Sequence, residues 1–410
     1  MLKPIGNYIR RTDRLLWLLC LGSSVLACIV LASISMEQMG GFQRDELTGA
    51  ITGLGDFRQV VVQAGAAFIG IVIAVILSQI DYHHLVQLWP LHAGLAWGAV
   101  LPTLFIQNLK LLGGSFVIGY APDGTDNHSW YKFGPLTFQP AELAKISFIL
   151  TFAMHLDHVR GRVNEPGVLF RLLLHLMIPC AVIHVQGDDG TMLIFLAIGV
   201  CMLFAAGLSW RYILGALTAA VCAVAVAFGF FSDKIGKSYQ WLRILAVYDP
   251  ENVSGWALNK EILQTYTWQQ ERGEIAIGAG QIFGRGLFSG DYVNIPYAWN
   301  DFVFSWIGNA VGFVGCTVVL VVLFGVVVRT LSTGIRSEDR LGSFICTGIA
   351  GAILAQILIN VGMNLRVLPV IGITLPFYSA GGTSVLMMYI CVGLILSVYM
   401  HNKKTLFGNE

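Results

Sequence analysis

The sequence predicts an all-α polytopic membrane protein with about ten transmembrane helices, and three observations support this fold class. Hydrophobic residues make up 56% of the 410 residues and charged residues only 12%, which is unlike a water-soluble globular protein. About ten segments approach the roughly 20 apolar residues that one helical crossing needs. A single long polar stretch, residues 232–300, separates spans seven and eight. We therefore expect one membrane domain, residues 1–410, that contains one long extracytoplasmic segment.

The expected spans are apolar runs, of which about eight remain when the weakest are dropped. The first run follows Arg10, Arg11 and Arg14 and has no convincing small-residue cleavage site after it, so it is expected to be an anchor and not a removed signal peptide. In chain order the runs are Leu15–Ile34, Val60–Ile80, Leu85–Ile106, Phe138–Met154, Val168–Val185, Met192–Leu208, Tyr212–Phe231, Phe302–Val328, Leu341–Val361 and Ser384–Tyr399.

Short loops rich in Lys and Arg tend to stay in the cytoplasm. If ten spans alternate, the basic N-terminus and three other basic segments fall on one side, so both termini are expected to be cytoplasmic. Residues 107–137, residues 232–300 and the stretch around Arg366 then lie outside. The net charge of +1 gives no indication of a nucleic-acid partner. The other basic segments contain Arg160 and Arg162; Arg329, Arg336 and Arg340; and Lys403 and Lys404.

Asp301 is the leading candidate for a catalytic residue. It stands where residues 232–300 give way to an apolar run in a chain with few charged residues, and the expected topology places it on the outer face. A carboxylate at this boundary could act as a general base. The alternative is an acid that only complements the positive N-terminal end of a helix.

Glu142 and Lys145 place ionisable groups beside an apolar span, where a central charge costs roughly 2.5 kcal/mol or more. Pro140 suits the first turn of a helix, and Glu142 suits its positive end. The two charged residues stand three positions apart and therefore share a helix face. They could form an internal ion pair, or Lys145 could offer its charge to an anionic ligand.

Asp188 belongs to a polar turn, residues 186–191, that joins the outer ends of two spans. Gly and Asp are good turn formers, so a simple hairpin turn would explain it. Alternatively, the carboxylate orients a base, pairs with Lys145 or holds a hard divalent cation, which takes oxygen ligands.

Two further tracts are rich in glycine. Residues 360–384 contain Arg366 and no acid, and their prolines and glycines favour an irregular segment that is buried in protein or lines a cavity, rather than a simple outer loop. Residues 275–286, which end near Arg285, could cradle a phosphate with bare backbone amides. Because this tract lacks the GxxxxGK[ST] pattern and follows no convincing strand, a plain flexible loop is the alternative.

Five tracts stand in a fixed order along the chain from Trp130 onward. They resemble the tracts of the SEDS family (shape, elongation, division and sporulation; the RodA and FtsW type). Single tracts carry little weight, whereas five in the family's order are specific. The matching residues are Trp130, Gly134, Phe138–Pro140, Glu142 and Lys145; Gln186 and Asp188–Thr191; Ala276–Gly286; Pro296 and Asp301–Phe304; and Asn360–Ser384.

The sequence departs from the family pattern beside the candidate acid. Asn300 replaces a threonine, and Asn309 and Ala310 stand where the family often has two acids. Ala141 replaces a serine and Gly187 a proline. These departures concern the neighbours of Asp301 more than Asp301 itself.

The resemblance implies a peptidoglycan glycosyltransferase of the bacterial cytoplasmic (inner) membrane, which polymerises lipid II at the outer face. It implies Asp301 as the base and Lys145, followed by Arg285 and Arg366, as the groups that neutralise the departing pyrophosphate. Glu142 and Asp188 complete the expected substrate-binding set. Two other classes stay open: a lipid II flippase or transporter, for which a broken intramembrane segment would be suitable, and a non-enzymatic scaffold of the cell-wall synthesis complex.

The resemblance also implies partners and a cofactor. A class B penicillin-binding protein, a transpeptidase, is the expected protein partner. Lipid II is the expected substrate, and membrane lipid surrounds the chain. A divalent cation, Mg²⁺ or Mn²⁺, is the expected cofactor if one is used, because it would neutralise a leaving pyrophosphate.

Overall fold

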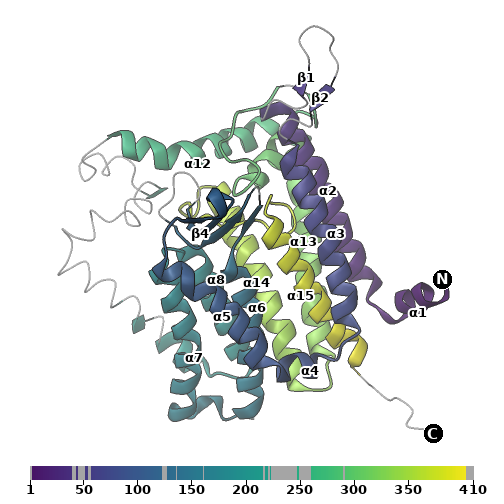
Figure 1. The fold of residues 1–410 in the computed structure, drawn as a ribbon, viewed down its shortest axis with the longest axis vertical. Helices are drawn as coiled ribbons and strands as arrows, with labels where there is room; N and C mark the ends of the chain where they lie inside the picture. The colour runs from purple at the N-terminus through teal and green to yellow at the C-terminus, as the bar shows by residue number, and fades with distance from the viewer. Residues whose placement is uncertain are drawn as a thin grey trace.

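The long helices stand side by side in one bundle (Figure 1). The computed structural model describes residues 2–38, 43–44, 51–53, 57–121, 127–134, 136–159, 161–215, 218–219, 222, 247–248, 260–289 and 291–402. Among these, six helices are long and apolar enough to cross a membrane. They are α2 (Arg14–Gln38), α3 (Arg58–Ser78), α7 (Pro166–Val185), α13 (Val303–Ile335), α14 (Arg340–Asn364) and α15 (Gly382–His401).

Three further helices complete the described bundle: α5 (Trp89–Phe105), α6 (Pro140–Val159) and the shorter apolar helix α8 (Asp189–Ala205). Together with the six long helices they correspond to nine of the expected spans. The seventh expected span, Tyr212–Phe231, lies largely outside the described residues. The prediction of a mainly helical, multi-pass membrane protein is therefore confirmed.

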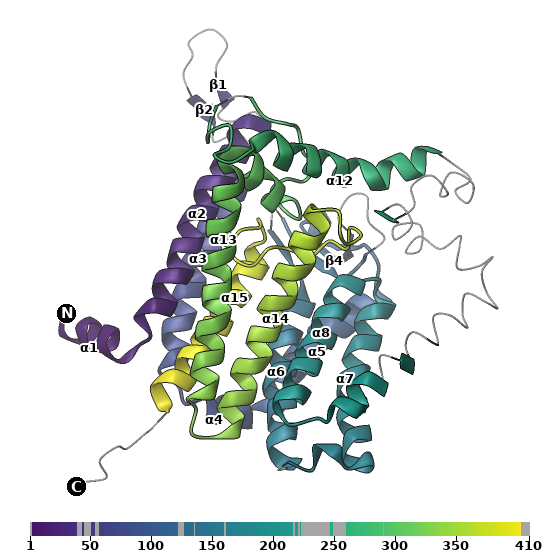
Figure 2. The ribbon, with the colours of Figure 1, turned by 180° about the vertical axis from the view of Figure 1, so that it is seen from behind.

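The helices alternate in direction, which separates two ends of the bundle. Helix α12 (Lys260–Gly280) lies across one end, here called the α12 end, where α6, α8, α13 and α15 begin (Figure 2). Helix α1 (Leu2–Arg11) and the last turn of α15 lie toward the opposite end, here called the terminal end. The basic residues Arg162, Arg329 and Arg340 belong to the terminal end, as the alternation predicts. Arg160, Lys403 and Lys404 lie outside the described residues.

A four-stranded antiparallel sheet at the α12 end replaces the loop expected over residues 107–137. Strands β3 (Leu109–Leu111), β4 (Phe116–Tyr120), β5 (Trp130–Phe133) and β6 (Leu136–Phe138) pair in chain order. The rings of Phe116 and Phe133 stack across β4 and β5, 4.6 Å apart. The Tyr131 hydroxyl donates to the Ala99 carbonyl oxygen at 2.9 Å and fixes the sheet to α5. A second, two-stranded sheet pairs β1 (Gln43–Arg44) with β2 (Ile51–Gly53).

Helix α12 continues into the glycine-rich tract over residues 275–286. A phosphate cradle or a flexible loop was expected over this tract, but its first residues are helical, and α12 ends at Gly280. Gly273 lies within α12, where its missing side chain lets the helix approach α13 closely. An added Cβ would lie 2.8 Å from the Ser305 Oγ atom. Residues 232–246, 249–259 and 290 of the expected extracytoplasmic segment lie outside the described residues.

Small residues allow α3 and α15 to pack closely against each other. An added Cβ on Gly70 would lie 2.7 Å from the Tyr389 Cβ atom, and one on Gly393 would lie 2.9 Å from the Ala74 Cα atom. The Tyr389 hydroxyl also shares a 2.7 Å hydrogen bond with Ser24 of α2. Close backbone approach at small residues and hydrogen bonds between helices are what associate helices in lipid, where hydrophobicity alone provides no driving force between them.

A polar cluster at the terminal end joins a short helix to the start of α14. His83, in the short helix α4 (Tyr82–Gln87), lies 2.7 Å from the Asp81 carboxylate and 2.6 Å from that of Asp339. The Tyr82 hydroxyl donates to Asp339 at 2.8 Å, and Asp339 accepts the Gly342 amide as N-cap of α14. Burial alone would lower the pKa of His83, but the two carboxylates outweigh it and raise that pKa.

We expect the His83 cluster to make stability depend on pH. Because the folded-state pKa is raised, its contribution is fully present below the ordinary value of 6.5 and is lost as pH rises through the folded-state pKa. The partly exposed cluster should contribute about 0.2–1 kcal/mol. Thermal unfolding at pH 6 and pH 9 checks this: His83→Gln should lower the melting temperature at pH 6 and have little effect at pH 9. An equal effect at both pH values would contradict it.

Candidate functional site

Asp301 lies in the turn just before α13, at the α12 end, and its carbonyl oxygen is tied to α14. Asn360 and Asn364 stand four residues apart and therefore on one face of that helix. Each donates its Nδ2 to the Asp301 carbonyl oxygen at 2.9 Å. Both asparagines are fully buried, whereas Asp301 is half-buried. Two side-chain amides of α14 therefore fix the backbone of the candidate acid.

The same two asparagines join the other segments around Asp301. The Asn364 Oδ1 accepts hydrogen bonds from the Ser305 amide at 3.0 Å and the Ser305 hydroxyl at 2.6 Å. The Asn360 Nδ2 also donates to the Ile373 carbonyl oxygen at 2.7 Å. Buried amides whose donors and acceptors are satisfied in this way specify one arrangement of the surrounding chain.

The segment between α14 and α15 is irregular and partly buried, as its prolines and glycines predicted. Phe377 and Tyr378 are almost fully buried, which does not fit a simple outer loop. The Ser379 hydroxyl donates to the Asn300 carbonyl oxygen at 2.6 Å, and the Ala380 amide donates to the Trp299 carbonyl oxygen at 2.6 Å. This segment therefore holds the residues just before Asp301, while α14 holds Asp301 itself.

Glu142 and Lys145 form the internal ion pair that was one of two alternatives. The Lys145 Nζ lies 2.7 Å from the Glu142 Oε1, with 7% and 10% of the two side chains exposed. A buried pair of this kind needs good geometry and further hydrogen bonds to offset its desolvation. The ion pair does not exclude the second alternative, because Lys145 could still attract an anionic ligand.

Asp188 is buried beside this pair. It accepts a 2.6 Å hydrogen bond from the Gln139 Nε2 and a 3.0 Å bond from the Thr191 amide, which makes it the N-cap of α8. Burial raises the pKa of the Asp188 carboxyl, although the Thr191 hydrogen bonds and the Lys145 charge act in the opposite direction. The charge of Lys145 thus acts on Asp188, but no ion pair among the described residues joins the two, so the Asp188–Lys145 pair stays a prediction.

Residues 371–373 connect this buried cluster to Asp301. A Cβ added to Gly190, two residues after Asp188, would lie 2.9 Å from the Ile371 carbonyl oxygen. A Cβ added to Gly372 would lie 3.7 Å from the Asp301 Oδ2. The start of α8 and the Asp301 carboxylate therefore contact the same short stretch of chain, and both glycines leave room there.

The two candidate arginines are engaged elsewhere. Arg366 pairs with two acids of α12, lying 3.8 Å from Glu271 and 3.5 Å from Glu274. Arg285 pairs with Asp291 of its own loop at 2.9 Å. Lys145 also pairs with an acid, Glu142, but it lies near Asp188, two residues before the Gly190 that contacts Ile371.

The glycine-rich tract forms a backbone pairing, which neither the phosphate cradle nor the flexible loop predicted. The amides of Arg285 and Gly286 donate to the carbonyl oxygens of Asn309 and Ala310 at 3.0 and 2.9 Å. In return the Phe313 amide donates to Gln281 at 2.9 Å. These bonds satisfy groups left open where α13 breaks at Gly312, whose φ of 73° and ψ of −166° are not helical. The amides at this break are therefore not available to an anion.

We expect Gly284→Ala to destabilise the protein. Gly284 has a φ of +76°, and an added Cβ would lie 2.3 Å from the Ala310 carbonyl oxygen. Strain and overlap together should cost about 1–3 kcal/mol. The control is Gly278→Ala, because a Cβ there meets nothing within 4 Å and alanine favours helix. Thermal unfolding of the two variants checks this, and equal melting temperatures would contradict it.

Asn309, which departs from the family pattern, has a structural role. The Asn309 side chain is fully buried and donates to the Ala276 carbonyl oxygen of α12 at 2.8 Å. Its Oδ1 is buried without a hydrogen-bond partner. An amide at this position thus connects α12 to α13, whereas Asn300 contributes its backbone carbonyl to Ser379.

The sequence analysis did not single out the residues that hold the Asp301 turn. One signal was available: Asn360, Asn364 and Gln63 are polar residues within or at the end of apolar spans, where polar groups are costly. Gln63 of α3 donates to the Phe377 carbonyl oxygen at 2.9 Å. The pattern cannot show which backbone carbonyl such a side chain reaches.

The described residues contain no group of three or more His, Cys, Asp and Glu side chains placed to hold a metal ion. Magnesium is, however, commonly bound by one or two carboxylates together with substrate phosphates. The expected Mg²⁺ or Mn²⁺ thus stays a prediction.

Comparison with known proteins places the chain among enzymes of cell-wall synthesis. A family profile described as that of cell cycle proteins of the FtsW, RodA and SpoVE type matches residues 13–404. The probable peptidoglycan glycosyltransferase FtsW of Geobacter sp. (strain M18) is 30% identical over 335 residues, 81% of this chain and 84% of that protein. The peptidoglycan glycosyltransferase MrdB of Escherichia coli (strain K12) is 26% identical over 396 residues, 95% of this chain and 94% of that protein.

Two solved structures share the fold. A chain from a peptidoglycan synthase complex, described for its coordination of polymerization and crosslinking, superposes with a TM-score of 0.72 and 24% identity, covering 96% of this chain and 99% of that one. The rod shape determining protein RodA of Thermus thermophilus superposes with a TM-score of 0.61 and 22% identity, covering 96% of this chain and 98% of that one.

Proposed function

Because this chain belongs to the FtsW, RodA and SpoVE family of cell cycle proteins, we propose that it is a peptidoglycan glycosyltransferase that polymerises lipid II. The observation that supports Asp301 as its base is the placement of this acid. Two buried asparagines fix its backbone at 2.9 Å, and its carboxylate faces the stretch of chain that the start of α8 contacts.

In the proposed reaction, the 4-hydroxyl of one lipid-linked disaccharide attacks the anomeric carbon of a growing chain. The new carbon–oxygen bond forms as the bond to the lipid pyrophosphate breaks. The Asp301 carboxylate takes the hydroxyl proton, which contributes on the order of 10² to 10⁴ in rate when the two groups lie within hydrogen-bond distance. A fixed backbone helps because the carboxylate then needs little reorganisation to meet the hydroxyl.

The second requirement is a positive group that neutralises the charge on the leaving pyrophosphate. We assign Lys145 this role first, because its cluster contacts residues 371–373 beside Asp301. Arg285 and Arg366 are second choices, since the acids with which they pair lie in α12 and in the loop of Arg285, and not beside Asp188. Glu142 and Asp188 then position Lys145. A bound Mg²⁺ or Mn²⁺ would supply further positive charge at the pyrophosphate, and removal of divalent cations with EDTA tests whether activity needs it.

The proposed location is the bacterial cytoplasmic membrane, with the α12 end outside and both termini in the cytoplasm. The basic residues that gather at the terminal end support this orientation. A class B penicillin-binding protein is the proposed partner, because a chain of similar fold belongs to a synthase complex that coordinates polymerization with crosslinking.

Purified protein supplied with lipid II, with and without a class B penicillin-binding protein, tests the proposal. Glycan polymer should form, and it should be absent when Asp301 is replaced by Ala. Transfer of lipid II across a vesicle membrane without any polymer would instead identify a flippase. A protein that forms no polymer, and that supports cell growth equally well with Asp301→Ala, would be a scaffold.

A further inference from the structure

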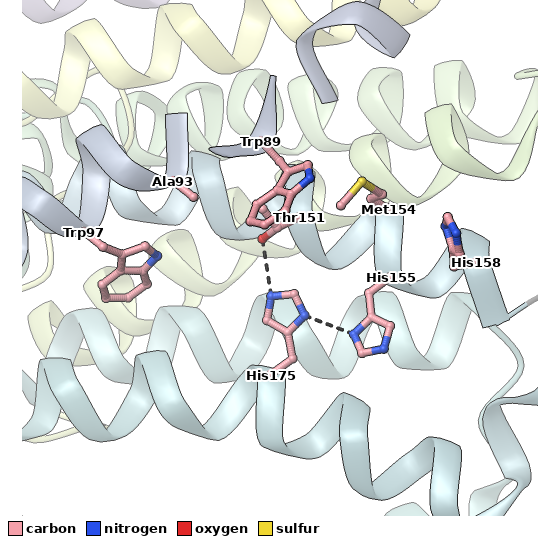
Figure 3. Close-up of a pocket in the computed structure, with 8 residues that line it drawn as sticks. All are labelled: Trp89, Ala93, Trp97, Thr151, Met154, His155, His158 and His175. Atoms are coloured by element: carbon pink, nitrogen blue, oxygen red, sulfur yellow. Dashed lines mark hydrogen bonds between the residues drawn. The ribbon is translucent and has the colours of Figure 1, made fainter. Parts of the chain in front are cut away.

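A groove of about 480 Å³ opens between α5, α6 and α7 in the half of the bundle nearer the terminal end (Figure 3). Its histidine end lies well away from the candidate site, because His158 follows Lys145 by 13 residues along α6, or ~20 Å of helix. Eight residues line it: Trp89, Ala93, Trp97, Thr151, Met154, His155, His158 and His175.

The histidines form a directed chain of hydrogen bonds. The Thr151 hydroxyl lies 3.0 Å from the Ser147 carbonyl oxygen and donates its only proton within the helix. Its oxygen therefore accepts from the His175 Nε2, 3.3 Å away, which leaves the His175 Nδ1 to accept from the His155 Nδ1 at 3.1 Å. His155 thus keeps its Nε2 for a ligand, and when protonated this atom carries an N–H that can donate to an anion.

Basic side chains stand next to the histidines. Arg171 lies one turn before His175 on the same face of α7, and His158 lies three residues after His155 on α6; both side chains are exposed. The residues that line the groove include no acid. The acids nearest in sequence are Asp157 and Glu165, and no described contact joins either of them to His155. An anion beside His155 and Arg171 would therefore be attracted.

The groove also has an apolar end, which Ala93 and Trp97 form away from His155 and His158 (Figure 3). Met154 lies beside these two histidines, and the partly buried Trp97 ring lies 6.3 Å from that of Phe195 on α8. Trp89 is the first residue of α5, at the terminal end, where tryptophan commonly marks the membrane–water boundary. The groove thus combines a basic end near the boundary with an apolar end deeper in the bundle.

We propose that this groove binds an anionic phospholipid from the membrane leaflet at the terminal end. The phosphate lies at His155, His158 and Arg171, and an acyl chain lies along Trp97 and Met154. Charge complementarity favours an anionic over a zwitterionic headgroup, because a Lys or Arg near the membrane surface contributes a factor of about five in affinity, and Arg171 is such a residue. The site requires only that the chain spans a membrane and does not depend on the proposed glycosyltransferase activity.

Quenching of tryptophan fluorescence by brominated lipids tests the proposal. Full-length protein in phosphatidylcholine nanodiscs is titrated with brominated phosphatidylglycerol or, separately, brominated phosphatidylcholine. We expect half-maximal quenching at an about fivefold lower fraction of phosphatidylglycerol. Because the chain has 10 tryptophans, Trp97→Phe identifies the signal: the preferential quenching should disappear in that variant.

The charge requirement has its own variant and control. The double variant His158→Gln/Arg171→Gln changes exposed side chains, so it should fold, and it should bring the two lipids to within about twofold. The control His84→Gln/Arg336→Gln removes the same residue types elsewhere at the terminal end and should keep the preference. Equal quenching by both lipids in the wild type, a preference that survives the double variant, or one that the control also loses would overturn the proposal. Loss of the quenching on addition of free glycerol phosphate would show that the headgroup alone is bound and would overturn a phospholipid as the occupant.

Discussion

Asp301→Asn should reduce lipid II polymerisation by about 10² to 10⁴-fold while the protein stays folded. The substitution keeps the size of the side chain and removes its charge. It also keeps the backbone carbonyl that Asn360 and Asn364 hold at 2.9 Å. Because those amides bind the main chain and not the carboxylate, the turn should survive the change. Glycan chain formation and thermal unfolding, measured on the same preparation, check both parts of the prediction.

Two further variants make the Asp301 result specific. Asp157→Asn makes the same change near the far end of α6 and should leave polymerisation within about twofold of the wild type, as surface changes usually do. Asp301→Glu keeps the charge but moves the carboxylate by one methylene group, so it should retain part of the activity. If Asp301→Asn polymerises lipid II as fast as Asp157→Asn, the acid serves only the start of α13, which was the other interpretation of its position.

Much of the bundle could be predicted from the sequence, because membrane spans depend on local composition. Nine expected spans correspond to described helices, and α7 begins and ends within about two residues of the predicted limits. The sheet over residues 109–138 was missed. Its strands are short. The sequence of β4 shows no alternation of polar and apolar residues, although these residues alternate between half-buried and buried in the folded sheet. Such strands depend on cross-strand contacts and not on propensity.

The candidate site was predictable in its residues but not in its connections. The chain brings Lys145, Asp188 and Asp301 to one end of the bundle, as the alternating spans required. That Asn360 holds the Asp301 carbonyl oxygen, or that the amide of Arg285 pairs with Asn309, follows from backbone positions separated by tens of residues. No local pattern specifies such long-range hydrogen bonds, so the glycine-rich tract suggested a phosphate cradle where the structure has a backbone pairing.

Lys145→Met should destabilise the protein by about 3–5 kcal/mol, because it leaves the Glu142 carboxylate buried without its partner. Their side chains are 7% and 10% exposed and lie 2.7 Å apart, so solvent can do little to stabilise the remaining charge. Asp188 would also lose the nearby positive charge that favours its ionised form. Thermal or denaturant unfolding of the purified protein measures the loss.

The double variant Glu142→Gln/Lys145→Met separates the two roles of Lys145. Removing both charges should recover at least half of the lost stability, because buried ion pairs are often replaceable by neutral residues. Polymerisation should nevertheless stay about 10² to 10³-fold below the wild type, the usual cost of removing one group that stabilises developing charge. A double variant that is both stable and fully active would show that the ion pair only offsets the cost of placing these two charges within the membrane. Stability recovered without activity is the result expected if Lys145 neutralises the departing pyrophosphate.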